Sequence, residues 1–447
     1  MATKGRVSAA FIAVTTLFFA WGFITSLIDP LVAAVKGIFT LSDTEAQLSA
    51  FAFFIAYGVV SFPAAALIAR WRAVPSILVA LGMMAAACLI MLGAANIANY
   101  TLVLLGLFVL ASGITILQVA ANPLAAALGP PQGKHFRLTL SQTFNSFGTF
   151  IGPWLGASLF LGGLEVGEGA SVGEGARAAS LAGIDRAYFW ICGLIVLLLL
   201  FFWVSRRTVA AAAAAAPAPA ARGIGSLIGD ALSSRWALAG GAAIFLYVGA
   251  EVAIGTQMAL FLNSDEVWRN SDAPFAVPLL GWAMGSDGVA GVSLQEAGKA
   301  VAFYWGGAMV GRAVGSALLA RFEAARLLAL FTAIAALMCL YVAGVGGVSA
   351  GFVALGIGFF NSIMFPVIFT LTLERSSAGE EATSGLLCTS IVGGAFLPLL
   401  VGMVSDSAGY VLALIVPAAC YVLLCVFALK AGRAEVRAPA VELAAIH

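Results

Sequence analysis

The sequence predicts an all-α integral membrane protein with twelve transmembrane helices, arranged as two pseudo-symmetric halves of six. Three observations support this fold class: an apolar composition, a regular series of apolar stretches, and similarity between the two halves. Hydrophobic residues make up 62% of the 447 residues and charged residues only 10%, against roughly 25% charged in soluble domains. So few charges cannot cover the surfaces of several soluble domains. The dominance of apolar residues also excludes a disordered chain.

Apolar stretches of the length that spans a bilayer, about 20 residues, recur from one end of the chain to the other. We count twelve, most of them joined by short loops. Their approximate centres are Trp21, Tyr57, Met84, Gly113, Thr149, Val196, Glu251, Val310, Ala336, Phe360, Gly394 and Val422. The first stretch follows Lys4 and Arg6 like a signal peptide, but it lacks a small-residue cleavage site and contains Asp29. We therefore expect an uncleaved first helix.

Basic residues predict the orientation, because Lys and Arg concentrate in cytoplasmic loops. When the 22 basic residues are sorted into alternating loops, most fall on the side that holds both termini. The exceptions are Lys36, Arg177, Arg186, Arg269, Lys299 and Arg312. We expect both termini in the cytoplasm and the chain in a bacterial inner membrane, with the lipid bilayer as its solvent.

The chain divides near its middle. Residues 206–235 carry an alanine and proline run between Ala210 and Ala221, which is typical of a linker. We therefore predict a first six-helix half at residues 1–205, a cytoplasmic linker at 206–235, a second half at 236–434 and a cytoplasmic tail at 435–447.

Short motifs recur at corresponding places in the two halves. The second helix ends in ALIARW at Ala66–Trp71 and the eighth in ALLARF at Ala317–Phe322, while the fifth and eleventh share a Gly-x-x-x-x-Pro spacing at Gly148 and Gly393. Two parallel repeats of six helices are the architecture of major facilitator carriers, which bind substrate at mid-membrane between the halves.

Ionisable residues inside predicted membrane helices are functional candidates, because charge is costly in hydrocarbon. Asp29 lies late in the first helix, Glu251 inside the seventh and Arg312 in the eighth. Each also has a structural interpretation: Asp29 as a carboxylate near the interface, and Glu251 with Arg312 as a fixed ion pair. Arginine stays charged at any working pH, so we favour an anchoring role for Arg312.

Amide side chains form a second group of candidates. Gln118 and Asn122 are four residues apart in the fourth helix, and Gln142 and Asn145 are three apart in the fifth, so each pair shares one helix face. Asn361 adds an amide from the second half. Primary amides offer both donors and acceptors and suit the hydroxyls of a neutral sugar. The alternative for each amide is a hydrogen bond that joins two membrane helices.

Aromatic rings supply the third element, because the apolar face of a sugar ring can rest on them. Trp21, Trp154 and Trp305 lie within helices, and Trp305 is our candidate for sugar contact. Contacts to lipid or to other helices are the alternative for all three. The remaining tryptophans near predicted helix ends, including Trp268, fit an aromatic belt at the membrane surface.

The sequence offers little for other chemistry. The six cysteines lie in apolar stretches without zinc-ligand spacing, and His135 and His447 lie outside the predicted helices, which excludes a histidine proton relay in the membrane. We find no catalytic triad, nucleotide loop or metal cluster, so we expect no enzyme activity, no cofactor and no metal site. No long basic run predicts nucleic-acid binding.

Several long strings resemble the fucose, galactose and glucose cation-symporter family of major facilitator carriers. The most distinctive is ASGITILQVAANPLAAALGP followed by HFRLTLSQTFNSFGTFIGP, at residues 111–130 and 135–153. The resemblance continues through FFAWGFITSLID at 18–29, YVGAEVAIG at 247–255, FNSIMFPVIFTL at 360–371 and CTSIVGGAFLPLLVGMVSD at 388–406. It thus spans both halves.

This resemblance implies roles for particular residues. It implicates Asp29 in transport, and Gln142 and Asn145 of the QTFNSFG string in sugar contact. Fucose-type members have a glutamate at the place of Gln118 and an uncharged glutamine at the place of Glu251. The LQVAANP and GAEV strings are closer to the glucose and galactose branch, some of whose members use sodium, so the coupling ion stays open.

Together these features predict a monomeric symporter of neutral hexoses such as glucose or galactose that works by alternating access. We expect Gln118, Gln142, Asn145, Glu251, Asn361 and Trp305 to contact the sugar, and Asp29 with Glu251 to handle the coupling cation, with H⁺ slightly favoured over Na⁺. An uncoupled sugar facilitator is the main rival, and a membrane enzyme or sensor is a distant one. The sequence leaves open which hexose is carried.

Overall fold

The computed structural model describes residues 2–128, 134–161, 174–213, 223–319 and 321–435, which form helices and turns without a β-strand. The helices of the first half are α1 (Ala2–Ser26), α2 (Ile28–Phe39), α3 (Asp43–Trp71), α4 (Ala73–Asn96), α5 (Tyr100–Ala127), α6 (Lys134–Phe160) and α7 (Glu174–Ala213). After α8 (Ile224–Ser233), the second half has α9 (Arg235–Leu262), η2 (Ala273–Ala276), α10 (Pro278–Met284), α11 (Leu294–Leu319), α12 (Ala324–Val345), α13 (Gly347–Asn361), α14 (Met364–Arg375), α15 (Glu380–Thr389), η3 (Ser390–Val392), α16 (Gly393–Ala408), α17 (Tyr410–Ala413) and α18 (Ile415–Arg433).

Each of the twelve predicted centres falls inside one of these helices, so the predicted all-α membrane fold is confirmed. Among the described residues, ten segments are long and apolar enough to cross a membrane. The other two long helices are α6 with 27 residues and α11 with 26. These two are more polar, because they carry several of the candidate site residues, including Gln142, Asn145 and Arg312.

Prolines interrupt two of the spans at their middle. Pro30 cannot donate the hydrogen bond that a helical residue gives to the carbonyl four positions earlier, and the chain turns at Leu27 between α1 and α2. Pro366 has the same effect on the carbonyl of Ser362, which lies in the break between α13 and α14. Both breaks expose backbone groups in a membrane-spanning helix, where the protein itself must satisfy them.

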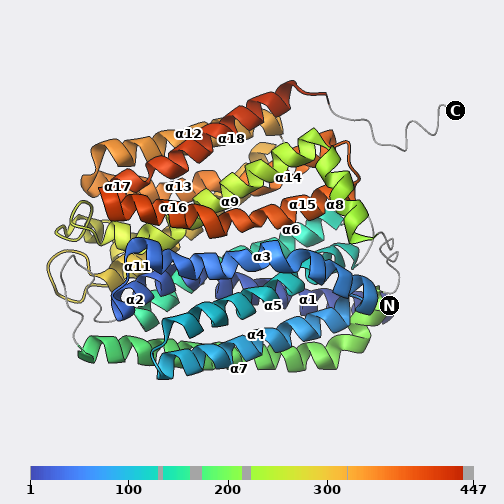
Figure 1. Cartoon of the computed structure of the whole chain (residues 1–447), viewed down its shortest axis with the longest axis horizontal. Helices are drawn as coiled ribbons and strands as arrows, with labels where there is room; N and C mark the ends of the chain where they lie inside the picture. Colours follow the sequence, from blue (N-terminus) through green and yellow to red (C-terminus); the bar gives the residue numbers. More distant parts are fainter. Residues whose placement is uncertain (1, 129–133, 162–173, 214–222, 320, 436–447) are drawn as a thin grey trace.

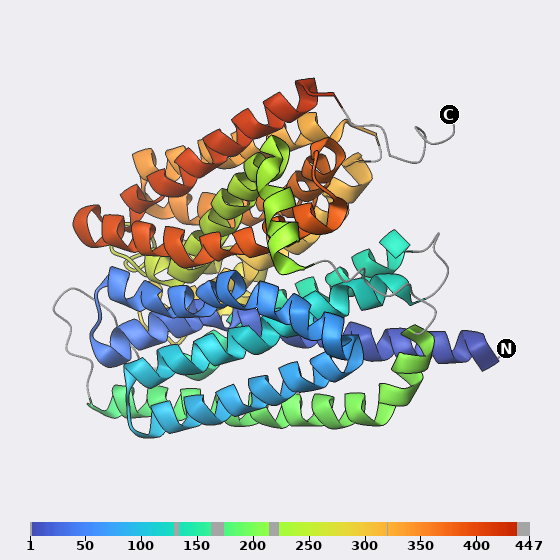
Figure 2. The same ribbon diagram turned by 45° about the vertical axis from the view of Figure 1, so that its right-hand side comes forward.

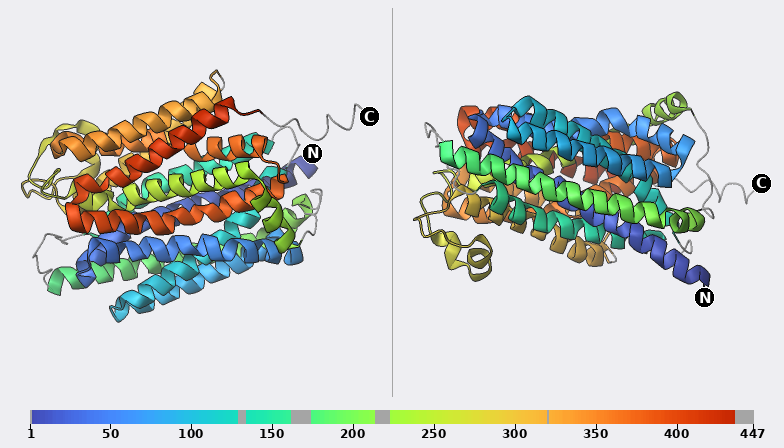
Figure 3. Two further views of the ribbon diagram at one scale, coloured as in Figure 1. Left: turned by 45° about the horizontal axis from the view of Figure 1, so that its top comes forward. Right: turned by 90° about the horizontal axis from the view of Figure 1, so that it is seen from below.

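The two halves lie side by side, with α1 to α7 on one side of the molecule and α9 to α18 on the other (Figure 1). Helix α1 begins and α18 ends at the same end of the bundle, which we call the terminal end. The opposite end, called the loop end, holds η2 and α10, which project beyond the long helices (Figure 3). The helices of the two halves lie closest at the loop end and diverge toward the terminal end (Figure 2).

Two helix pairs make most of the contact between the halves. Helix α3 packs against α16, and α6 packs against α11. Thus the second span of each half meets the fifth span of the other, as expected for two repeats related by a pseudo-twofold axis.

The domain boundaries stay a prediction. Helix α7 continues past residue 205 to Ala213, α8 lies in the predicted linker, and α9 begins at Arg235. Residues 214–222 of the linker and 436–447 of the tail lie outside the described residues.

Glycines let neighbouring helices approach closely, and Gly113 gives a test of this packing. A Cβ at Gly113 of α5 would lie 2.6 Å from Cγ of Met84 and 2.8 Å from the carbonyl oxygen of Ala80, both in α4. We expect Gly113→Ala to lower the free energy of unfolding by about 1 to 3 kcal/mol, because the backbone of α4 must move. The measurement is the apparent melting temperature of purified protein. Gly93→Ala is the control, since nothing lies within 4 Å of its Cβ. Equal melting temperatures for the two variants would contradict the packing argument.

Candidate functional site

Asp29 stands at the contact between the two halves. It lies in the first turn of α2, directly before the proline that breaks the first span. Its side chain is only 3% exposed, and Nε1 of Trp305 in α11 donates a hydrogen bond of 2.6 Å to Oδ2. A buried carboxyl group therefore joins the first half to the second through a single indole.

Helix α9 packs against Asp29 and Trp305 at Gly255. A Cβ at Gly255 would lie 3.3 Å from Oδ1 of Asp29 and 3.1 Å from Cζ2 of Trp305. Glu251 lies four residues earlier in the same helix and therefore on the same face, about 6 Å along the axis. The two acids are electrostatic neighbours. The predicted coupling residues thus lie together although they come from different halves.

Tyrosines hold Glu251 in place. The hydroxyl of Tyr247 donates to Oε1 of Glu251 at 2.7 Å, and the hydroxyl of Tyr304 donates to the backbone carbonyl of Glu251 at 3.2 Å. Nδ2 of Asn361 donates to the hydroxyl of Tyr304 at 2.7 Å. Glu251 itself is partly exposed, whereas Asn361 is fully buried behind Tyr304. In this conformation Asn361 supports Tyr304 and does not face an open space.

Arg312 does not form the ion pair with Glu251 that the sequence offered as an alternative. Among the described residues, no ion pair within 4.0 Å joins them. Instead Nη1 of Arg312 donates to Oγ of Ser146 in α6 at 2.5 Å, and Nε donates to the carbonyl of Ser362 at 3.4 Å. That carbonyl is the one that Pro366 leaves without a helical partner. Arg312 thereby anchors the break in the tenth span to the first half, and it remains an electrostatic neighbour of Glu251.

The predicted amides divide into two sets. Nε2 of Gln118 donates to the hydroxyl of Tyr57 at 2.7 Å, and Nε2 of Gln142 makes a long bond of 3.4 Å to Oδ1 of Asn122. These amides are partly exposed, and the long bond of Gln142 is expected for a group that exchanges a protein partner for a ligand. The structure thus brings the pairs from α5 and α6 together.

Asn145 is engaged differently. Its Nδ2 donates to the backbone carbonyl of Phe18 in α1 at 3.1 Å, and its side chain lies against Gly22. That geometry fits the helix-joining alternative. Its role in sugar contact stays a prediction.

Only one of the three interior tryptophans reaches the centre. Trp305 bonds Asp29, as described above. Trp21 is buried against the ring of Phe18, with centroids 4.2 Å apart. Trp154 lies toward the loop end, where its Nε1 donates to the carbonyl of Ala283 at 2.9 Å. The aromatic-belt interpretation is wrong for Trp268, which is fully buried and donates to the carbonyl of Val348.

The structure adds residues that the sequence analysis missed. Tyr247 lies one helical turn before Glu251, so helical spacing alone could have indicated it. Gln47 and Thr256 are fully buried at the contact between the halves, where Oγ1 of Thr256 donates to Oε1 of Gln47 at 2.9 Å. No single-sequence pattern distinguishes these two from ordinary polar residues of a membrane helix.

A separate hollow lies on the terminal side of Glu251, where α9 meets α15 and η3. Its volume is about 400 Å³, and it is lined by Leu238, Gly241, Ala242, Phe245, Leu246, Leu386 and Ser390. Only Ser390 contributes a polar side chain. This lining is unsuited to a polyhydroxylated ligand.

The described residues hold no cluster of three or more metal-ligating side chains. His447 lies outside the described residues, as does the side chain of His135.

Comparison with known proteins places this arrangement in a family. The Major Facilitator Superfamily matches residues 10–386. The chain belongs to this superfamily of transporters. It is 37% identical over 421 residues to the glucose/galactose transporter of Brucella abortus, which covers 94% of this chain and 93% of that protein. It is 30% identical over 429 residues to the L-fucose-proton symporter of Escherichia coli, covering 94% and 92%.

A solved structure agrees with the sequence comparison. The crystal structure of the Escherichia coli fucose:proton symporter in the outward conformation matches with a TM-score of 0.66 and 27% identity, covering 96% of this chain and all of that one. The resemblance to the fucose, galactose and glucose cation-symporter family is thus confirmed, and so is the prediction of a transporter in place of an enzyme.

The bond between Trp305 and Asp29 has a direct test. We expect Trp305→Phe to lower the free energy of unfolding by about 1 to 3 kcal/mol, because the ring is kept while a buried carboxyl oxygen loses its donor. The measurement is the apparent melting temperature in detergent. Trp190→Phe is the control, since Trp190 is 69% exposed. In a protein that already carries Asp29→Leu, Trp305→Phe should lower the free energy of unfolding by less. Equal effects with and without Asp29 would show that the bond does not stabilise the protein.

Proposed function

We propose that this protein is a cation-coupled symporter of neutral hexoses that works by alternating access. One observation carries the proposal: Asp29 of the first half is an electrostatic neighbour of Glu251 of the second at mid-bundle, and Trp305 of the second half bonds Asp29. A carboxyl group so placed can take up a cation on one side and release it on the other when the halves rock. The Brucella abortus glucose/galactose transporter and the Escherichia coli fucose-proton symporter support the substrate class and the coupling.

The sugar site that we propose combines Gln118, Gln142 and Glu251 with the ring of Trp305. Two partly exposed amides and a partly exposed carboxyl group offer both donors and acceptors to sugar hydroxyls. The indole offers an apolar face for the pyranose ring while its N–H holds Asp29. Sugar and cation would then both bind Glu251, which gives a physical route for coupling. Asn145 and Asn361 stay candidates for contacts that form in another conformation.

The coupling cation that we favour slightly is H⁺. Asp29 and Glu251 are the acids that the described central helices offer, since Gln118 stands where fucose-type relatives have a glutamate. Sodium is the alternative, since two carboxyl groups with nearby carbonyl oxygens could also hold a hard cation. An uncoupled facilitator remains the rival in which both acids serve only the fold.

We further propose that the protein acts as a monomer in a bacterial inner membrane, with both termini in the cytoplasm. The distribution of basic residues supports this orientation. The terminal end then faces the cytoplasm and the loop end faces outward.

Uptake into proteoliposomes tests the proposal. Labelled glucose, galactose and mannose are offered under a proton gradient, a sodium gradient or neither. We expect uphill accumulation with one cation only, and competition by free hexoses but not by hexose phosphates, because the site offers amides and acids to its ligand. Inhibition by a hexose phosphate alone would exclude a neutral substrate, and counterflow without accumulation under either gradient would favour the facilitator.

Gln142 should contribute to binding more than to folding. A hydrogen bond between an amide and a sugar contributes roughly 0.5 to 1.5 kcal/mol net, so Gln142→Ala should weaken sugar binding up to about tenfold. Binding to purified protein is measured by calorimetry, and size-exclusion chromatography verifies the intact monomer. Asn96→Ala is the control, since Asn96 is an exposed amide that bonds Asp185 near the loop end. Wild-type affinity in Gln142→Ala would remove this residue from the site.

Asp29 should be dispensable for exchange but required for uphill uptake. Asparagine keeps the shape of the aspartate and its bond from Trp305 but cannot take up a proton. We therefore expect Asp29→Asn to retain sugar counterflow while it loses gradient-driven accumulation. Glu251→Gln should impair both, because we assign Glu251 to sugar as well as to the cation. Normal accumulation by Asp29→Asn would show that the coupling site is elsewhere.

A further inference from the structure

The N-terminus of α3, at the loop end, uses all of its free backbone donors. The first N–H groups of a helix have no partner within the helix. Here two of them belong to a capping box: the side chain of Ser42 accepts from the amide of Glu45 at 3.1 Å, and the side chain of Glu45 accepts from the amide of Ser42 at 2.9 Å. The box leaves the amides of Asp43 and Thr44 for another acceptor.

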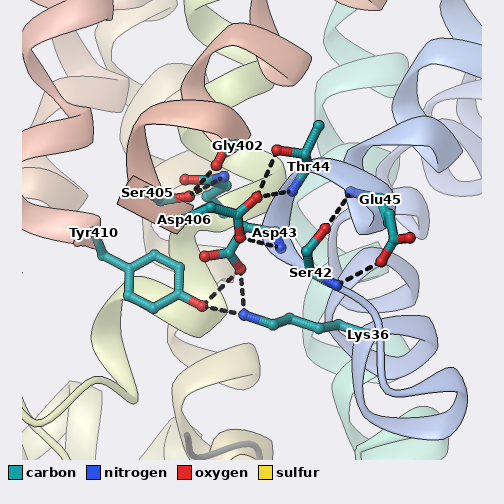
Figure 4. Close-up of polar contacts among 10 residues, drawn as sticks. Lys36, Ser42, Asp43, Thr44, Glu45, Gly402, Ser405, Asp406 and Tyr410 are labelled. Carbon is teal, nitrogen blue, oxygen red and sulfur yellow. Dashed lines mark hydrogen bonds and ion pairs between the residues drawn. The ribbon is translucent and has the colours of Figure 1, made fainter. Parts of the chain in front are cut away.

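That acceptor comes from the other half of the protein. Oδ1 of Asp406 in α16 accepts from the amide of Asp43 at 2.6 Å, and Oδ2 accepts from the amide of Thr44 at 2.9 Å and from its hydroxyl at 2.5 Å (Figure 4). A carboxylate at a helix N-terminus also interacts favourably with the helix dipole. Asp406 thus completes the cap of a helix that belongs to the opposite half.

A second group of contacts lies beside the cap. Lys36 of α2 forms an ion pair with Asp43 and donates to the hydroxyl of Tyr410 at 2.6 Å, and that hydroxyl donates to Asp43 at 2.8 Å (Figure 4). Tyr410 lies in α17 of the second half. The side chains of Lys36 and Asp43 are only 15% and 6% exposed. This shielding strengthens their attraction relative to a pair in open water.

The backbones of the two halves touch at the same place. Gly402 lies one turn before Asp406 in α16, and a Cβ there would lie 2.9 Å from Cα of Thr44 and 3.0 Å from the carbonyl oxygen of Asp43. Both neighbours are backbone atoms, so they cannot rotate away. The close approach of α16 to the start of α3 therefore requires glycine at this position.

All hydrogen bonds between the halves, among the described residues, lie from the middle of the bundle to the loop end. Arg312 with Ser146, Trp305 with Asp29 and Thr256 with Gln47 join them in the middle. At the loop end they are joined by the contacts of Asp406 and Tyr410. Two further bonds there involve α6: Trp154 donates to the carbonyl of Ala283, and Gln295 donates to the carbonyl of Ser158. The structure is therefore the conformation that is closed at the loop end.

We propose that Lys36, Asp43, Thr44, Asp406 and Tyr410 form a lock that holds the loop end closed and positions the halves for the inward-facing state. The proposal rests on the alternating access of the proposed function. An outward-facing conformation must separate α16 from the start of α3, and this breaks every one of these contacts. The strength of the lock then sets how often the protein opens outward.

Two features suit the lock to repeated opening. The capping box of Ser42 and Glu45 lies wholly within the first half, so α3 stays capped when Asp406 leaves and water reaches the amides of Asp43 and Thr44. In addition, α2 carries Asp29 and Lys36 seven residues apart and hence on one face. Both side chains bond the second half, so a change at Asp29 is transmitted along one short helix to the lock.

Accessibility of a buried reporter tests the lock. Thr256 is fully buried between the halves, so Thr256→Cys reacts with a soluble maleimide only when they separate. The rate is measured on purified protein in nanodiscs without sugar, after subtraction of labelling at the six native cysteines in matched protein without the reporter. In this background, Asp406→Ala and Gly402→Ala should label at least about threefold faster than the parent, because a cap and a close contact are lost. Asp406→Glu should label more slowly than Asp406→Ala, since it keeps the carboxylate.

Two controls match these variants. Asp265→Asn removes an acid that pairs with Arg269 within the second half, and Gly344→Ala adds a Cβ where nothing lies within 4 Å; both should label at the parent rate. If Asp406→Ala does not fold, Gly402→Ala decides alone. Labelling of Asp406→Ala and Gly402→Ala at the control rate would overturn the lock. Because the assay contains no sugar, this result is distinct from a failure to transport hexose.

Discussion

A carboxyl group buried in the middle of a membrane protein needs a partner, and in this chain the partner of Asp29 lies in the other half. Neither half alone satisfies that group: the first supplies the acid and the second supplies the indole of Trp305 together with the glycine surface of α9. Because burying a polar group without a partner is unfavourable, the bond from Trp305 to Asp29 stabilises the contact between the halves at mid-bundle. The same dependence makes the contact sensitive to any event that changes Asp29.

Broken helices extend this constraint to the backbone. Each proline in a membrane span leaves a carbonyl without its helical donor, and a bilayer offers no water to replace it. At Pro366 the guanidinium of Arg312 takes that place and also bonds Ser146 in the first half. An arginine that the sequence suggested as a partner of Glu251 is in fact an anchor for a helix break. Arg312 thus links the helix break at Pro366 to the first half.

Much of the fold could be predicted from the sequence, because a membrane helix is defined by the length of an apolar stretch and little else. The proximity of Asp29 and Glu251 was also predictable, since charge in hydrocarbon leaves few alternatives, whereas the bond from Trp305 to Asp29 was not. The amides were harder. Asn145 and Gln142 lie three residues apart in one string, yet one braces the backbone of α1 and the other holds only a long bond to Asn122. Which amide is available to a ligand depends on how closely α1 and α6 pack at Gly22 and Gly148. The periodicity of the sequence does not encode that distance.

The tyrosines and the lock show a second limit of sequence reasoning. In the sequence, Tyr247 and Tyr304 are indistinguishable from apolar core aromatics. In the structure, the hydroxyl of Tyr247 donates to the carboxylate of Glu251, and that of Tyr304 donates to its backbone carbonyl. Asp406 looks like an acid at a helix end, and only the assembled halves show that it caps a helix hundreds of residues away. Contacts within each half are largely apolar, whereas those between the halves combine the packing of α3 on α16 and of α6 on α11 with a few directional bonds at discrete places. In the proposed alternating access, these directional bonds are exchanged for water one set at a time while the packing within each half stays intact, so that the halves can rock without unfolding.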